Sequence, residues 1–123
     1  MLSPSYRIAC EPERDLVRIT MSGFFSVEQV QEFATARAEY YAQLRCPPNQ
    51  HLTLCDASQM RIQTQEVVAA FARVVQMPEF RSRRLAIIVG SSLARIQTQR
   101  VSERDGVKLF RSVVDAEEWL FAA

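Results

Sequence analysis

The stretch Leu85-Ala86-Ile87-Ile88-Val89-Gly90-Ser91-Ser92 determines how the rest of the chain is interpreted. Five consecutive apolar residues that end at a glycine and two serines are typical of a strand that is buried on both faces. Such strands occupy the centre of sheets that carry helices. The stretch therefore predicts an α/β domain, with a new helix beginning just after the strand.

A pair of strands precedes the first helix. Residues 6–10 and 16–21 have the composition of strands, and the loop between them contains a proline and four charged residues, which predicts an antiparallel hairpin. Apolar residues then recur at helical spacing over residues 27–44. Ser26 and Gln29, which precede and open this helix, have the spacing of a capping box.

The remaining segments continue the alternation of strands and helices. The expected elements are a strand over 52–55 that stops at Asp56, a helix from Thr64 to just before Pro78, the strand 85–89, a helix over 93–103, a strand over 107–110 and a helix over 116–121 capped by Asp115. The order β-β-α-β-α-β-α-β-α predicts one sheet of about five strands, mostly parallel and covered by helices. No linker divides the chain, so residues 1–123 are expected to form one domain.

The composition disfavours several classes of protein. The chain has 123 residues, 48% hydrophobic and 24% charged, with 15 Lys and Arg against 14 Asp and Glu. A net charge of +1 does not favour nucleic-acid binding, and the basic run at 81–84 is expected to be a solvated loop. No apolar run approaches the roughly 20 residues of a membrane helix. Residues 1–5 lack the features of a signal peptide, so we expect a cytoplasmic protein.

Cysteine and histidine usage argues against a metal site or a nucleophilic enzyme. Cys10, Cys46 and Cys55 are odd in number and lack C-x-x-C spacing, which disfavours a disulfide framework and a structural zinc site. Cys10 and Cys55 fall in strands, where a cysteine behaves as a small buried hydrophobe. His51 is the only histidine and opens an apolar strand. We therefore expect no enzyme, no cofactor and no bound metal.

Four stretches, in their order and spacing, carry a resemblance to a known family. They are LVRITMSGFFS at 16–26, LCDAS at 54–58, RLAIIVGSSLAR at 84–95, and VKLF at 107–110 followed by DAEEWL at 115–120. Over about residues 6–120 the chain resembles the SpoIIAA-like branch of the STAS superfamily, the anti-sigma-factor antagonists. The resemblance implies a non-catalytic regulatory module that binds a protein partner or a second copy of itself. Some members of this branch are similar to Sec14-like domains, which implies as the alternative a carrier or sensor of a small apolar or anionic ligand.

The resemblance also implies a regulatory position. In anti-sigma-factor antagonists the strand ends in an Asp-rich turn, and a phosphorylatable Ser or Thr opens the following helix. Here the corresponding turn runs over residues 56–64, which makes Thr64 the candidate phospho-acceptor and Ser58 the second candidate hydroxyl. The family's Asp-Ser-Ser-Gly run is absent and is replaced by QTQE at 63–66. A plain N-cap is the alternative role of Thr64.

A candidate ligand or partner surface follows the ends of two predicted parallel strands, where ligands bind in open α/β sheets. Its residues are Asp56, Ser58, Arg61, Gly90, Ser91, Ser92 and Arg95. The Gly-Ser-Ser run at a helix start provides N–H groups and hydroxyls that suit an anion, helped by Arg95. A strand break at Gly90 and a helix cap at the serines explain the same residues.

One short sequence occurs twice. SxxRIQTQ begins at Ser58 and again at Ser92, so that RIQTQ occupies both 61–65 and 95–99. No third copy is present, which excludes a solenoid. Coincidence, or a constraint shared by two equivalent turns, would each explain the repetition.

Large apolar residues are numerous for a chain of this length, and most of them are expected in the core. Any that gather on the surface would mark a dimer contact or a pocket. The carrier alternative predicts a closed apolar cavity on the order of several hundred Å³.

Overall fold

The computed structural model describes residues 5–101 and 105–122. Its elements are β1 (Ser5–Glu11), the 3-10 turn η1 (Pro12–Arg14), β2 (Leu16–Gly23), α1 (Val27–Tyr41), β3 (Leu52–Met60), α2 (Gln65–Val75), the 3-10 turn η2 (Pro78–Phe80), β4 (Arg84–Ile88), α3 (Ser92–Val101), β5 (Val107–Phe110) and α4 (Val113–Leu120).

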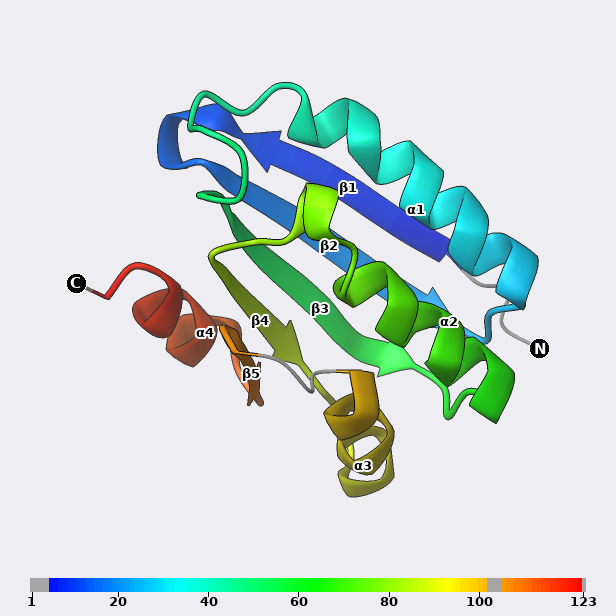
Figure 1. The fold of residues 1–123 in the computed structure, drawn as a ribbon. Helices are drawn as coiled ribbons and strands as arrows, with labels where there is room; N and C mark the ends of the chain where they lie inside the picture. Colours follow the sequence, from blue (N-terminus) through cyan, green and yellow to red (C-terminus); the bar gives the residue numbers. More distant parts are fainter. Residues whose placement is uncertain (1–4, 102–104, 123) are drawn as a thin grey trace.

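The five strands form one sheet in the order β1-β2-β3-β4-β5 (Figure 1). β1 and β2 are antiparallel, and every later neighbouring pair is parallel. The predicted fold class, with its N-terminal hairpin and mostly parallel sheet, is therefore confirmed.

The helices divide between the two faces of the sheet. α1 and α2 pack side by side on one face, with α3 next to α2, whereas α4 packs on β3, β4 and β5 from the other face (Figure 1). Because successive strand residues point to opposite faces, Leu52 and Leu54 contact the α4 side, and Thr53 and Cys55 face α2. The sheet is thus the middle layer of three.

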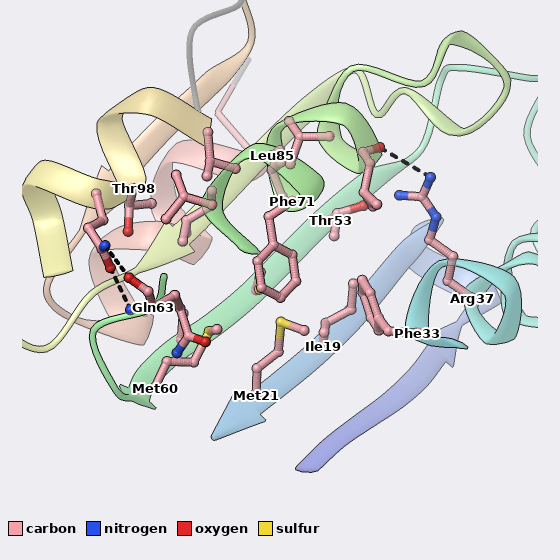
Figure 2. A pocket seen from close by; sticks show the side chains of 18 of the residues that line it. Ile19, Met21, Phe33, Arg37, Thr53, Met60, Gln63, Phe71, Leu85 and Thr98 are labelled. Carbon is pink, nitrogen blue, oxygen red and sulfur yellow. Dashed lines mark hydrogen bonds between the residues drawn. The ribbon is translucent and has the colours of Figure 1, made fainter. Parts of the chain in front are cut away.

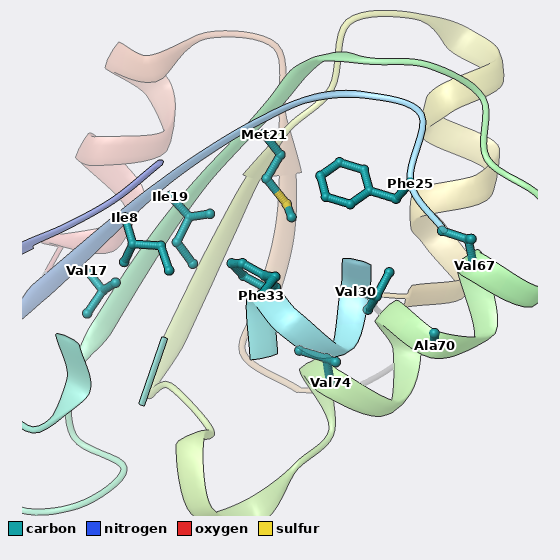
Figure 3. Packing of buried hydrophobic residues seen from close by; sticks show 10 residues of the cluster. All are labelled: Ile8, Val17, Ile19, Met21, Phe25, Val30, Phe33, Val67, Ala70 and Val74. Atoms are coloured by element: carbon teal, nitrogen blue, oxygen red, sulfur yellow. The ribbon is translucent and has the colours of Figure 1, made fainter. Parts of the chain in front are cut away.

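The larger core cluster lies between α1, α2 and the N-terminal strands (Figure 3). Val17, Ile19 and Met21 alternate along β2 and meet Val30 and Phe33 of α1. Each of these side chains is 5% exposed or less. A second cluster, which includes Leu16 and Leu120, lies under α4. The alternation read in the sequence therefore explains which residues each face buries.

Two of the predicted helix starts are confirmed. Ser26 and Gln29 form the expected capping box, because Ser26 Oγ accepts from Gln29 N and Gln29 Oε1 accepts from Ser26 N. Thr64 caps α2, since its Oγ1 accepts a hydrogen bond from Val67 N at 3.2 Å.

The predicted start of the terminal helix is wrong. α4 begins at Val113 rather than at residue 116, and its cap is Ser112, whose Oγ accepts from Asp115 N. Val113 and Val114 are exposed and β-branched, so neither the apolar pattern nor helix propensity signals this first turn.

Three other boundaries differ from the prediction or lie beyond the described residues. α1 ends at Tyr41, and residues 42–44 continue as a turn in which Leu44 N donates to Tyr41 O. β3 does not stop at Asp56 but continues to Met60, because Asp56 pairs with β2 and β4 and, after an irregularity in the register, Gln59 and Met60 pair with β2. Polarity of the side chains did not end the strand, since pairing depends on backbone groups. The expected end of the third helix at Glu103 falls outside the described residues.

Candidate functional site

Five predicted site residues meet in a pocket at the carboxyl ends of β3 and β4. This strand-end pocket has a volume of about 370 Å³, and its lining consists of Ser58, Val89, Gly90, Ser91, Ser92, Arg95 and Arg111. Sequence reasoning missed Arg111. It directly follows β5, whose end lies beside that of β4, so the same strand-end rule would have found it.

Close backbone packing at Gly90 forms the floor of this pocket. A Cβ on Gly90 would lie 2.5 Å from the carbonyl oxygen of Ser58, so only glycine allows the two segments to approach this closely. Val89 N donates to Phe110 O at 3.0 Å, which brings the residue after Phe110 to the same edge. Ser91 Oγ accepts from Ala94 N at 3.1 Å and so caps α3.

Asp56 and Arg61, also predicted for this surface, do not line the strand-end pocket. Asp56 Oδ1 accepts hydrogen bonds from Ser58 N at 3.0 Å and from Ser58 Oγ at 2.6 Å. Asp56 therefore positions the Ser58 side chain. Arg61 lines a different cavity, under α2. The structure thus divides the predicted surface into a pocket and two residues beside it.

The two candidate phospho-acceptors lie in different surroundings. Thr64 is exposed at the N-terminus of α2, the helix that follows β3, which is the position that the family resemblance assigns to the switch. Ser58 is half-buried in the strand-end pocket and bonded to Asp56. Thr64 is the more accessible hydroxyl of the two.

The two RIQTQ copies contact each other but are not equivalent turns. Residues 61–64 form the connection into α2, whereas 95–99 lie inside α3. Gln97 Oε1 accepts from Gln63 N at 2.8 Å, and Gln97 Nε2 donates to Gln63 O at 2.7 Å. The Gln97 side chain of the second copy therefore provides hydrogen-bond partners for the backbone N–H and carbonyl groups of Gln63 in the first.

Four exposed apolar residues lie on adjoining segments near these contacts. Leu93 and Ile96, three residues apart on α3, are 65% and 59% exposed, and Phe24 and Ile62 are 47% and 43% exposed. The Gln63–Gln97 bonds hold Ile62 beside α3, and Arg61 N donates to Gly23 O at 3.0 Å, next to Phe24. We call these four residues the exposed apolar face.

A second hollow, which we call the interior cavity, lies between α2 and the sheet and is partly open to solvent (Figure 2). Its volume is about 120 Å³, and most of its lining is apolar. The cavity is far smaller than the carrier alternative predicted and lies below the roughly 300–1,000 Å³ of typical ligand pockets.

Arg37 of α1 is the charged residue buried at this cavity. It is 5% exposed, and its Nη2 donates to Val74 O at 3.2 Å. Its Nε is buried and has no hydrogen-bond partner among the described residues. Burial lowers the pKa of Arg37, an effect that Tyr41 and Glu79 oppose. The amphipathic pattern of α1 did not signal this residue, because an arginine at such a position usually faces water.

The cysteine thiols lack the features of catalytic nucleophiles. Burial, helped by the Asp56 carboxylate, raises the pKa of the Cys55 thiol to about 12, and burial also raises the pKa of Cys10 and Cys46. These thiols are protonated at neutral pH and are weak nucleophiles. His51 is buried and its Nε2 lies 3.1 Å from Ser82 Oγ. Within the described ranges, no three His, Cys, Asp or Glu side chains are grouped to hold a metal ion.

No protein-family model matches the sequence, and no curated protein matches it. Solved structures do match nearly the whole chain. One is an uncharacterised protein of the DUF3478 family with a SpoIIAA-like fold from Shewanella loihica PV-4, with a TM-score of 0.72 at 18% identity over 98% of this chain and 97% of that one. This chain has a SpoIIAA-like fold.

A second solved structure with this fold is an anti-sigma factor antagonist from Mycobacterium paratuberculosis. Its TM-score is 0.63 at 14% identity, over 94% of each chain. The SpoIIAA-like resemblance inferred from the order of four sequence stretches is thus confirmed at the level of the fold. None of the helices in the described part of the chain has both the length and the apolar character needed to cross a membrane.

Proposed function

We propose that this chain is a non-catalytic, STAS-type regulatory module that binds a protein partner through its exposed apolar face. The observation that carries the proposal is the exposure of Leu93 and Ile96 on α3, together with that of Ile62 and Phe24 on segments joined by hydrogen bonds next to it. Burying one such side chain against a partner contributes about 1.5–3 kcal/mol. The similarity in fold to an anti-sigma factor antagonist supports a partner that is a protein.

The charges beside this face favour an acidic partner surface. Arg95 lies between Leu93 and Ile96 on α3 and lines the strand-end pocket together with Arg111. Ser91 and Ser92 add hydroxyl groups at the same edge of the sheet. Peripheral charges of this kind increase association rates and discriminate among partners.

An affinity experiment tests the apolar face. The double substitution Leu93→Asp and Ile96→Asp places charges on exposed positions of α3, so the fold is expected to remain intact. Lysate proteins captured by the wild-type chain are identified, and their binding is measured directly by calorimetry. We expect the double variant to lose at least about tenfold in affinity.

Val114→Asp is the matched control, because Val114 is 66% exposed on α4, which covers the opposite face of the sheet. It should bind the partner as the wild type does. Equal affinity of the double variant and the wild type would exclude this face as the interface. If the wild type instead sediments as a dimer that the double variant disrupts, the partner is a second copy of the chain.

We further propose that phosphorylation of Thr64 regulates this binding. A phosphate on an exposed helix N-cap interacts favourably with the helix dipole and adds roughly −2 charge close to the apolar face. Thr64→Glu should change partner affinity, whereas Thr64→Ala, which removes the same N-cap hydroxyl without adding charge, should leave it near that of the wild type. Thr35→Glu, on the exposed side of α1, is the matched control. Unchanged affinity of Thr64→Glu would contradict the switch.

A further inference from the structure

The interior cavity and Arg37 have no role in the proposed binding of a protein. Buried charged groups are normally paired with an opposite charge, because desolvation of a single ion is costly. The ion pairs of the described residues join Arg14 and Arg18 to Glu11 and Glu117, and none of them includes Arg37. Arg37 is therefore a buried cation without an ion-pair partner in the described part of the chain.

The contacts of Arg37 orient its guanidinium but leave hydrogen-bonding capacity. Nη2 donates to Val74 O and lies 3.3 Å from Met77 Sδ. The guanidinium carbon lies 4.9 Å from the ring centre of Phe80 and 5.8 Å from that of Tyr41. The buried Nε has no partner among the described residues. A carboxylate is the acceptor that best suits a guanidinium group that lines a cavity.

The shape and volume of the cavity limit the size of the apolar part of a ligand. Figure 2 places Arg37 at one end and Gln63 and Thr98 at the other, with Phe71 and Met21 between them. The volume of about 120 Å³ is similar to that of an engineered apolar cavity in another protein, roughly 150 Å³, which binds benzene. One aromatic ring or a short branched chain fits this space, and a lipid tail does not.

We propose that the interior cavity binds a small monocarboxylate with an aromatic or branched apolar body. The carboxylate accepts hydrogen bonds from Arg37, and the apolar body lies between Phe71 and the sheet. The site is distinct from the exposed apolar face, so its test is independent of the proposed binding of a protein partner.

A titration of the wild-type chain tests the site with benzoate and benzyl alcohol, which share a ring and differ in charge. We expect benzoate to shift the NMR signals of cavity residues such as Ile19, Phe71 and Val74. Benzoate should bind at least about tenfold more tightly than benzyl alcohol, as a hydrogen bond to a charged group implies. Shifts confined to residues outside the cavity, no shifts at millimolar benzoate, or equal affinities would overturn the proposal.

Arg37→Met keeps much of the apolar bulk and removes the charge. It should weaken benzoate binding by at least about tenfold and leave the affinity for benzyl alcohol unchanged. Arg73→Met, an exposed substitution on α2 one residue from Val74, is the matched control and should bind both probes as the wild type does. An unchanged affinity for benzoate in the Arg37→Met variant would show that Arg37 does not bind the carboxylate. If this variant does not fold, the affinities of the wild-type chain for benzoate and benzyl alcohol decide whether the carboxylate is recognised.

Discussion

The two RIQTQ copies have one sequence and two structures. In the first copy, Gln63 is 8% exposed and its side chain bonds to the backbone of the loop around Gly23. In the second copy, Gln97 is half-buried on α3, and its side chain bonds to the backbone of Gln63. The threonines differ as well, since Thr64 caps a helix and Thr98 Oγ1 donates to Ala94 O at 2.7 Å within one.

This difference shows that contacts outside the repeated segment determine its conformation. Arg61 N donates to Gly23 O, which keeps the first copy extended at the end of β3. The second copy follows Ser91, which caps α3 and starts the helix that contains it. Helix propensity is a weak preference that such tertiary contacts override.

Gln63→Ala should be the most destabilising change within the two copies. Gln63 Oε1 accepts from Phe25 N at 2.8 Å, and Nε2 donates to Gly23 O at 3.0 Å and to Arg61 O at 2.5 Å. The substitution leaves the Phe25 amide buried without its acceptor, so we expect a loss of about 2–3 kcal/mol in the free energy of unfolding. Urea denaturation measures it.

Gln97→Ala is the matched change in the second copy. It removes two hydrogen bonds at a half-buried position, which water partly replaces, and should cost about 1 kcal/mol. Equal losses for the two alanine variants would show that the copies are energetically equivalent, contrary to the structure.

Gly90→Ala should have the next largest effect, because Gly90, two residues before the second SxxRIQTQ segment, packs against Ser58, the first residue of the other segment. The new Cβ would meet the Ser58 carbonyl oxygen at 2.5 Å, and a backbone atom cannot rotate away. We expect a loss of about 2 kcal/mol, as for overpacking of a tight contact. Ser92→Ala, two residues later and exposed, is the control and should change the unfolding midpoint little. A stable Gly90→Ala variant would contradict this close approach.

The two threonines provide the smallest difference. Thr64→Ala removes an N-cap and should cost about 1 kcal/mol. Thr98→Ala lies within a helix, where the higher helix propensity of alanine offsets the lost bond to Ala94, so its effect should stay within about 0.5 kcal/mol. Thermal unfolding measures both losses of stability. A larger loss for Thr98→Ala than for Thr64→Ala would contradict the assignment of Thr64 as a stabilising N-cap.

Local signals in the sequence predicted much of the fold and part of the candidate site. Ser26 and Thr64 mark the helix starts that they cap in the structure. The rule that ligands bind at strand ends predicted that Ser58 and Arg95 would lie close together. Asp56 does not line the strand-end pocket and instead accepts hydrogen bonds from Ser58.

The element order and the faces that each element buries were determined by the sequence itself. Apolar periodicity, helix caps and glycine breaks act between residues a few positions apart, and they can therefore be read along the chain. The tertiary structure alone determined the conformations of the two RIQTQ copies and the placement of Arg37 at an internal cavity. Each depends on contacts between distant segments, such as that between Arg37 and Val74, and such contacts leave no local pattern.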